Sequence, residues 1–136
     1  MLKTVVKAIV LTLGLTGPAM AQERLLISSD WGSVTADLVD NDATKLLVQM
    51  LPVTIEMRDH LRQDKTGNLP SPLPPVARQT AFTKGTIGLW SFDHFVIYYR
   101  DGRVPHPGII ILGQVTGHVA IFDRPGSVTV RIELAK

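Results

Sequence analysis

The side chains with which this chain could do chemistry are those of histidine, aspartate, glutamate, serine, tyrosine and arginine, because its 136 residues include no cysteine. Without thiolates the chain has no cysteine nucleophile, no iron–sulfur cluster and no cysteine zinc site. Two acid–histidine pairs stand out in the sequence, Asp59-His60 and Asp93-His94. An acid beside a histidine is typical of a general base or of a metal site.

The spacing of the histidines argues against a metal site. Metal ligands usually recur at defined intervals, such as two histidines four residues apart on one helix face. The histidines of this chain are scattered, at His60, His94, His106 and His118. We interpret them as exposed turn residues and predict neither a metal nor a cofactor. A Gly-x-Ser-x-Gly elbow and a glycine-rich phosphate loop are also missing, which disfavours serine hydrolases and nucleotide-binding proteins.

Residues 1–21 are predicted to be an export signal. Lys3 and Lys7 supply its positive end, residues 5–15 are mostly apolar, and Ala19-Met20-Ala21 fits the small-x-small cleavage rule. The apolar stretch is too short for a membrane anchor, which needs about 20 residues. We therefore expect a periplasmic or secreted protein that starts at Gln22 and has no membrane contact after cleavage.

The remaining residues, 22–136, are expected to form one domain. Removal of Lys3 and Lys7 would leave 12 basic residues against 12 acidic ones, and no basic stripe with interleaved aromatic residues is present. Nucleic-acid binding is therefore not expected. A chain of this length can bury a core without disulfides, which agrees with the absence of cysteine.

The pattern of apolar residues predicts a mostly-β protein. Alternation and β-branched runs predict strands at residues 24–29, 33–39, 53–57, 86–90, 95–99, 109–115 and 128–134. Gly113 inside the sixth of these suggests a bulge or a close backbone approach. Residues 119–122 are expected to form a short turn or helix, and residues 59–85, rich in proline, a long loop. Strands of this number favour a closed barrel, which leaves no open edge and fits a monomer or weak oligomer.

One amphipathic helix is predicted after Asp40-Asn41, which can cap it. The apolar residues that follow have the spacing i, i+3, i+4 and i+7 of a single core-facing stripe. They are Ala43, Leu46, Leu47 and Met50. Pro52 then ends the helix, because proline removes a hydrogen-bond donor.

Several motifs resemble the bacterial cyclophilin-like domain family of small β-barrels, in order and at compatible spacings. They are Asp40-Asn41-Asp42-Ala43-Thr44, Leu51-Pro52, Gly67-x-Leu69-Pro70, Gly85-x-Ile87-x-Leu89-Trp90 and Leu112-Gly113-Gln114-Val115. The likeness covers residues 34–134 and implies a cyclophilin-like barrel with one or two short helices. Family members commonly show Glu-Lys-Tyr-Gly where this chain has Asp64-Lys65-Thr66-Gly67.

A more distant likeness is to the true cyclophilins, which are peptidyl-prolyl isomerases with a catalytic arginine on the strand after the first helix. Arg58 ends the matching strand here, so the resemblance implies Arg58 as the catalytic candidate. Prolyl isomerisation needs only a donor to the prolyl nitrogen and an apolar pocket, because the barrier is the double-bond character of the amide. The candidate ligand-binding residues are Arg62, Phe82, Trp90, Phe92 and Phe95.

Two functions remain open from the sequence. The favoured one is an exported module without catalytic activity that binds a peptide or a small molecule between the long loop and the Trp90–Phe95 region. In that case Arg58 would pair with Asp59 or another acid, the phenylalanines would belong to the core, and Trp90 would lie in the core or at the barrel mouth. The alternative is a weak peptidyl-prolyl isomerase that acts on exported proteins.

Overall fold

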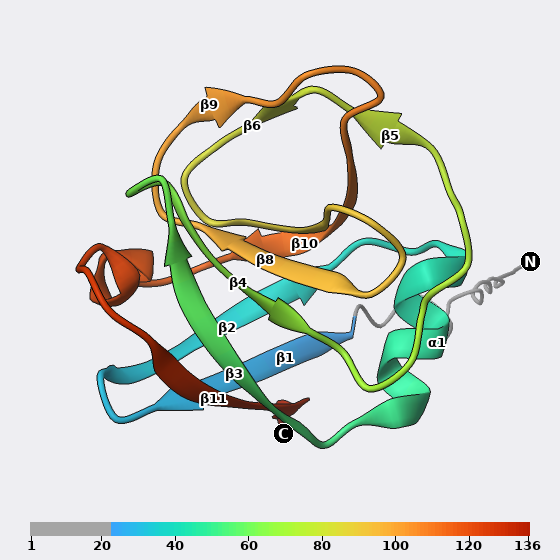
Figure 1. Ribbon diagram of the computed structural model, residues 1–136. Coiled ribbons are helices and arrows are strands. Elements are labelled where there is room, and N and C mark those ends of the chain that lie inside the picture. The colour runs from blue at the N-terminus through green and yellow to red at the C-terminus, as the bar shows by residue number, and fades with distance from the viewer. Residues whose placement is uncertain (1–22) are drawn as a thin grey trace, which may run out of the picture.

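The computed structural model describes residues 23–136, in which eight strands close into an antiparallel barrel (Figure 1). Around the barrel the strands are β2 (Gly32–Leu38), β1 (Arg24–Ser29), β11 (Val128–Leu134), β3 (Val53–His60), β4 (Asp64–Asn68), β8 (His94–Tyr98), β7 (Thr86–Leu89) and β10 (Ile109–Val115). Pairing of β10 with β2 closes the circle. The prediction of a closed, mostly-β barrel is confirmed, whereas the predicted signal lies outside the described residues.

Helix α1 (Asp42–Met50) packs against the barrel core. The Asn41 side chain accepts a hydrogen bond from the Thr44 N–H at 2.8 Å, and the Thr44 hydroxyl accepts one from the Asn41 N–H at 3.1 Å. Ala43 and Leu47 are fully buried, as predicted, but Leu46 is 37% exposed. The predicted stripe is wrong at Leu46 because Thr44 occupies the buried face, where its hydroxyl bonds the Val39 carbonyl.

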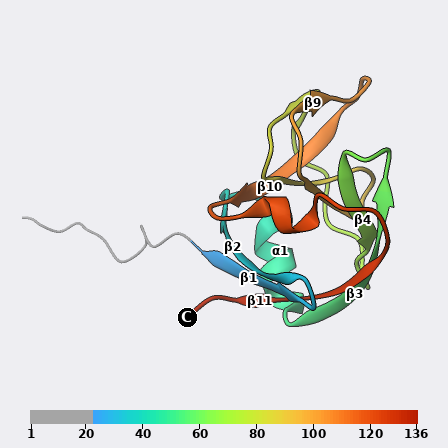
Figure 2. The ribbon, with the colours of Figure 1, turned by 90° about the vertical axis from the view of Figure 1, so that its left-hand side faces the viewer.

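The opposite end of the barrel is covered by the 3-10 helix η4 (Val119–Phe122). Figure 2 looks along the barrel from that end, with η4 in front of α1. Val119 and Phe122 are buried in the same core as the inward residues of the strands. The predicted short turn or helix at this place is confirmed.

Strand β4 is the largest departure from the expectation drawn from the sequence. Residues 59–85 were expected to form a loop, but Asp64–Asn68 pair with β3 on one side and β8 on the other. The sequence signal is weak because Asp64, Lys65 and Thr66 are polar, although all three are buried. The same segment contains β5 (Arg78–Gln79) and β6 (Ala81–Phe82).

A second, smaller core lies outside the barrel wall. Strand β6 pairs with β9 (Gly102–Arg103) to form an arm above β8 (Figure 1). This outer core contains Phe82, Val96, Tyr98, Val104 and Ile109. The Phe82 and Tyr98 rings stack with centroids 3.7 Å apart. Strand β8 is therefore buried on both faces, which explains its uninterrupted apolar run.

Gly113 lies where two strand backbones approach each other. The register between β10 and β7 shifts between Ile111 and Gly113, and a Cβ atom at residue 113 would collide with the Asp37 carbonyl. The bulge or close approach predicted for Gly113 is thus confirmed.

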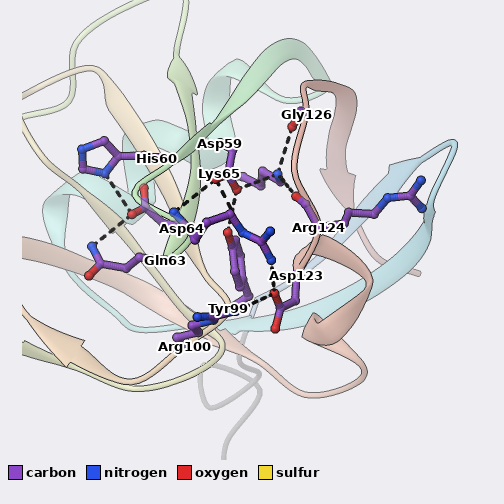
Figure 3. A network of polar contacts seen from close by, with 11 residues as sticks. Asp59, His60, Gln63, Asp64, Lys65, Tyr99, Arg100, Asp123, Arg124 and Gly126 are labelled. Atoms are coloured by element: carbon purple, nitrogen blue, oxygen red, sulfur yellow. Dashed lines mark hydrogen bonds and ion pairs between the residues drawn. The ribbon is translucent and has the colours of Figure 1, made fainter.

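The ammonium group of Lys65 lies inside the η4 end of the barrel, although lysine is rarely buried (Figure 3). The side chain has no exposed surface, and its Nζ donates to Asp59 Oδ1 at 2.8 Å and to the carbonyl oxygens of Arg124 and Gly126. The ring centroids of Trp31 and Tyr99 lie 5.0 and 5.7 Å from Nζ. Lys65 thereby ties the loop after η4 to the barrel wall.

Asp59 is the counter-ion of Lys65. Its Oδ1 also accepts a hydrogen bond of 2.6 Å from the Tyr99 hydroxyl. Burial by itself raises the pKa of Asp59, but the hydrogen bonds from Lys65 and Tyr99 and the charge of Lys65 outweigh it and hold the pKa below its ordinary value. Asp59 is therefore ionised in the folded protein at neutral pH, as the pairing with Lys65 requires.

We predict that Lys65→Met lowers the free energy of unfolding by about 3–5 kcal/mol, because it leaves the Asp59 carboxylate and two carbonyls without their shared donor. Urea denaturation measures this change. The matched control is Lys45→Met, which removes an exposed lysine whose nearest carboxylate is 4.0 Å away and should change stability by less than about 0.5 kcal/mol. Equal stability of the two variants would contradict the prediction.

Candidate functional site

A pocket of about 390 Å³ opens on the outer face of the barrel wall. Its lining residues come from β3, β4, the turn between β7 and β8, and the start of β8. They are Arg58, His60, Thr66, Trp90, Ser91 and His94. Among the described residues, no acid lines this pocket.

The pleat of β4 determines which of its side chains face the pocket. Lys65 pairs with Ile97, and both belong to the barrel interior, so their neighbours Thr66 and Val96 face outward. On the other side of β4, Thr66 stands opposite Arg58 and Asp64 stands opposite His60. The outer face of β3 and β4 therefore presents four polar side chains as two cross-strand pairs.

Thr66 is the most deeply buried polar residue among those that line the pocket. The residue is only 4% exposed, and its hydroxyl has no hydrogen-bond partner among residues 23–136. Two further buried polar atoms of the described chain share this condition, Asp64 Oδ2 and the Tyr98 hydroxyl. All three side chains project from the outer face of β4 and β8. Buried polar groups are normally paired, so their concentration beside one pocket is unusual.

Asp64 orients His60. The His60 Nδ1 lies 3.1 Å from Asp64 Oδ1, which also accepts a hydrogen bond of 3.2 Å from Gln63 Nε2. Figure 3 shows this group beside the Lys65 network. Because Nδ1 is occupied by the carboxylate, Nε2 is the ring nitrogen that remains for a ligand. The Trp90 ring meets the His60 ring edge to face, with centroids 6.3 Å apart.

The carboxyl group of Asp64 is fully buried. This burial raises its pKa, and the hydrogen bonds from His60 and Gln63 offset only part of the effect. Burial also raises the pKa of the Tyr98 phenol, and the charge of Asp64 adds to this, while the neighbouring Trp90 acts in the opposite direction. Burial therefore disfavours the charged forms of Asp64 and Tyr98.

Arg58 is exposed at the rim of the pocket. Its Nη2 lies 3.5 Å from His94 Nε2, and it forms no ion pair with any residue between 23 and 136. The expected pairing of Arg58 with Asp59 is wrong, because Asp59 points to the barrel interior and pairs with Lys65. The guanidinium is therefore available to a ligand.

The structure brings together only two of the residues predicted to form a site, Arg58 and Trp90. Phe95 is buried inside the barrel and Phe82 in the outer core, which agrees with the alternative expectation that the phenylalanines belong to the core. Phe92 is 49% exposed, and its ring centroid lies 6.0 Å from the Arg78 guanidinium. Arg62 is at the barrel end, where its Nη2 bonds Asp123 Oδ1 at 2.8 Å.

Three interpretations of single residues need correction. Trp90 lies neither in the barrel core nor at a barrel mouth but on the outer wall, where it is half-buried against the outer core and lines the pocket. His60 and His94 are not turn residues: they end β3 and begin β8, and both line the pocket. His106 and His118 are exposed, as predicted.

Thr66 and the two pocket histidines, His60 and His94, were not predicted as site residues from the sequence. The alternation of side chains along β4 would have placed Thr66 beside Arg58, but only if the strand had been recognised. Within residues 23–136, no cluster of three or more histidines and acids is suited to a metal ion. In the same range, neither helix has the length and apolar character needed to cross a membrane.

The pocket has the composition of an anion site with an apolar wall. Arg58 carries a fixed positive charge, His60 and His94 offer ring nitrogens, and Thr66 offers a hydroxyl. Trp90 supplies a flat surface on which an apolar group can pack.

Comparison with known proteins agrees with this fold. The model of the cyclophilin-like family matches residues 27–133. The solution structure of a hypothetical protein from Archaeoglobus fulgidus is similar, with a TM-score of 0.69 and 10% sequence identity, over 88% of this chain and 100% of that one. At this identity the likeness shows the fold alone. No curated protein matches the chain.

The raised pKa of Asp64 predicts a pH-dependent stability difference. Above the folded-state pKa, the ionised carboxylate costs stability, and this cost disappears as the pH falls toward the ordinary value of 3.8. Asp64→Asn should therefore be more stable than the wild type at neutral pH, and the difference should shrink at acidic pH. Urea denaturation across this range measures it, with the exposed Asp30→Asn as control. Lower stability of Asp64→Asn at neutral pH would refute the prediction.

Proposed function

Since this chain belongs to the cyclophilin-like family, as its motifs had suggested, we propose that it is a binding module whose outer-wall pocket holds a peptide or a small molecule that carries an anionic group. The observation that supports this most is the position of Arg58. It stands at the rim of a pocket beside Trp90, with no carboxylate of the described chain as its partner.

An unpaired arginine costs little at the protein surface, where water solvates it, and becomes a strong contact once a ligand excludes that water. A hydrogen bond to a charged group contributes about 1.5–3 kcal/mol, more than one between neutral groups. The planar guanidinium of Arg58 can hold both oxygens of a carboxylate. His94, 3.5 Å from it, adds a second nitrogen on the same side of the pocket.

Trp90 complements this charge with apolar surface. The indole ring meets the His60 ring edge to face. The backbone of Trp90 is fixed by a hydrogen bond of 3.0 Å from its N–H to the His94 carbonyl oxygen. A rigid aromatic side chain in a pocket contributes contact area at little entropic cost. The ligand therefore combines an anionic group at Arg58 with an apolar body on Trp90.

A second candidate function is weak peptidyl-prolyl isomerisation of exported proteins. It is favoured by the same residue, because Arg58 on β3 stands in a pocket with an aromatic neighbour and could donate toward a prolyl nitrogen. The phenylalanines that would grip the proline ring are in the two cores, at Phe82 and Phe95, or away from the pocket, at Phe92. Binding is therefore the better supported function.

The binding proposal predicts that Arg58→Gln weakens the binding of phenylacetate at least tenfold, because a charge-assisted hydrogen bond is lost. Phenylacetate is chosen because it joins a carboxylate to an aromatic ring. The measurement is an NMR titration that follows the indole N–H resonance of Trp90. Arg131→Gln, on β11 away from the pocket, is the control and should bind as the wild type does. An Arg58→Gln variant with undiminished affinity would contradict the proposal.

The two candidate functions are separated by a protease-coupled prolyl isomerisation assay on the wild type and Arg58→Ala. A binding module without catalytic activity gives the uncatalysed rate with every residue before proline. If the wild type accelerates the reaction and Arg58→Ala does not, the isomerase is established instead and Arg58 is its catalytic residue.

A further inference from the structure

We infer that the pocket selects a monoanionic carboxylate over a phosphate, and that the hydroxyl of Thr66 donates a hydrogen bond to this carboxylate. The inference rests on the proposed function and specifies the ligand of the same pocket. It follows from two features that anion binding by Arg58 alone does not explain: the buried hydroxyl of Thr66 and the buried carboxyl group of Asp64.

The Thr66 hydroxyl is a polar group without a structural task. It is buried, it has no hydrogen-bond partner among the described residues, and its residue lines the pocket. A valine would have the same shape and would avoid the cost of an unpaired buried hydroxyl, about 1–3 kcal/mol. A ligand oxygen in the pocket would give this hydroxyl an acceptor.

Thr66 and Arg58 are placed to share one anion. They are directly opposite each other on β4 and β3, and such cross-strand neighbours have Cβ atoms about 4.5–5.5 Å apart. A carboxylate above this pair can direct one oxygen to the guanidinium and the other to the hydroxyl. The apolar part of the ligand that carries this carboxylate can pack on the neighbouring indole ring of Trp90.

Asp64 is the reason for selecting a single negative charge. It lies two residues before Thr66 on the same face of β4, is fully buried, and has one oxygen without a partner. A phosphate monoester carries close to two negative charges at neutral pH, and its repulsion from Asp64 is about twice that of a carboxylate. Water cannot screen Asp64 effectively, because the carboxyl group has no exposed surface.

Other charged groups around the pocket do not reverse this preference. His60 faces Asp64 and is held by it, and His94 faces Arg58. The cations at the η4 end, Arg62 and Arg100, are paired with Asp123. Arg78 also lies close by, and its Nη1 donates to the carbonyl oxygens of Trp90 and Gly108. Of the arginines among the described residues, only Arg58 lines the pocket, and one carboxylate matches its charge.

The test compares three probes in the NMR titration of the wild type: phenylacetate, phenyl phosphate and neutral 2-phenylethanol. We expect phenylacetate to bind at least several-fold more tightly than phenyl phosphate, and 2-phenylethanol to bind most weakly. Tighter binding of phenyl phosphate than of phenylacetate would overturn the inference while leaving the proposed function intact. If none of the probes shifts the Trp90 indole resonance, the proposed function fails as well.

Two variants assign the effect to its residues. Thr66→Val should weaken phenylacetate binding roughly tenfold, yet leave the unfolding free energy equal to or above that of the wild type, because no protein partner is lost. Asp64→Asn should strengthen binding of phenyl phosphate more than that of phenylacetate. Wild-type affinity of Thr66→Val for phenylacetate, or an equal effect of Asp64→Asn on both anions, would overturn the inference.

Discussion

The buried ammonium of Lys65 is the constraint on which the arrangement of the barrel wall depends. Its transfer from water is costly, and only the set of acceptors at the η4 end offsets that cost: Asp59, Arg124 and Gly126. These acceptors exist in one place, so Lys65 can face inward only when β4 has its observed register. A shift of β4 by one residue would place Lys65 outside and Asp64 and Thr66 inside the barrel, where nothing pairs with them.

The same constraint builds the pocket on the opposite side of the wall. Because residues alternate along a strand, an inward Lys65 turns Asp64 and Thr66 outward, where they meet His60 and Arg58 of β3. Two clusters of polar side chains therefore lie on opposite faces of the same wall, Lys65 with its acceptors inside and the pocket residues outside. The inner cluster stabilises the fold. In the outer cluster, among the described residues, the Thr66 hydroxyl has no hydrogen-bond partner and the Arg58 guanidinium has no carboxylate partner.

The barrel could be predicted where burial and apolar character coincide. Strands such as Ile109–Val115 carry β-branched side chains whose alternation follows from local sequence, and the Asn41 cap is likewise local. Strand β4 could not be predicted, because its residues are polar and the burial of Lys65 depends on the carbonyl oxygens of Arg124 and Gly126, 59 and 61 positions away. The candidate site was predicted only in part. Arg58 directly follows a predicted strand and Trp90 ends another, whereas the places of Thr66 and His60 in the site depend on the unpredicted strand β4. Phe95 was predicted to bind a ligand, but its side chain lies in the barrel core. The sequence alone does not show to which side of the barrel wall the Phe95 side chain points.

The proposed ligand site is the outer-wall pocket, which is lined by Arg58, Thr66 and Trp90. A crystal structure of the protein soaked with phenylacetate would show where this ligand binds. We expect the carboxylate between Arg58 and Thr66, with the ring packed against Trp90. Phenylacetate found instead at the η4 end of the barrel beside Arg62 and Arg100, with the outer-wall pocket empty, would contradict this expectation.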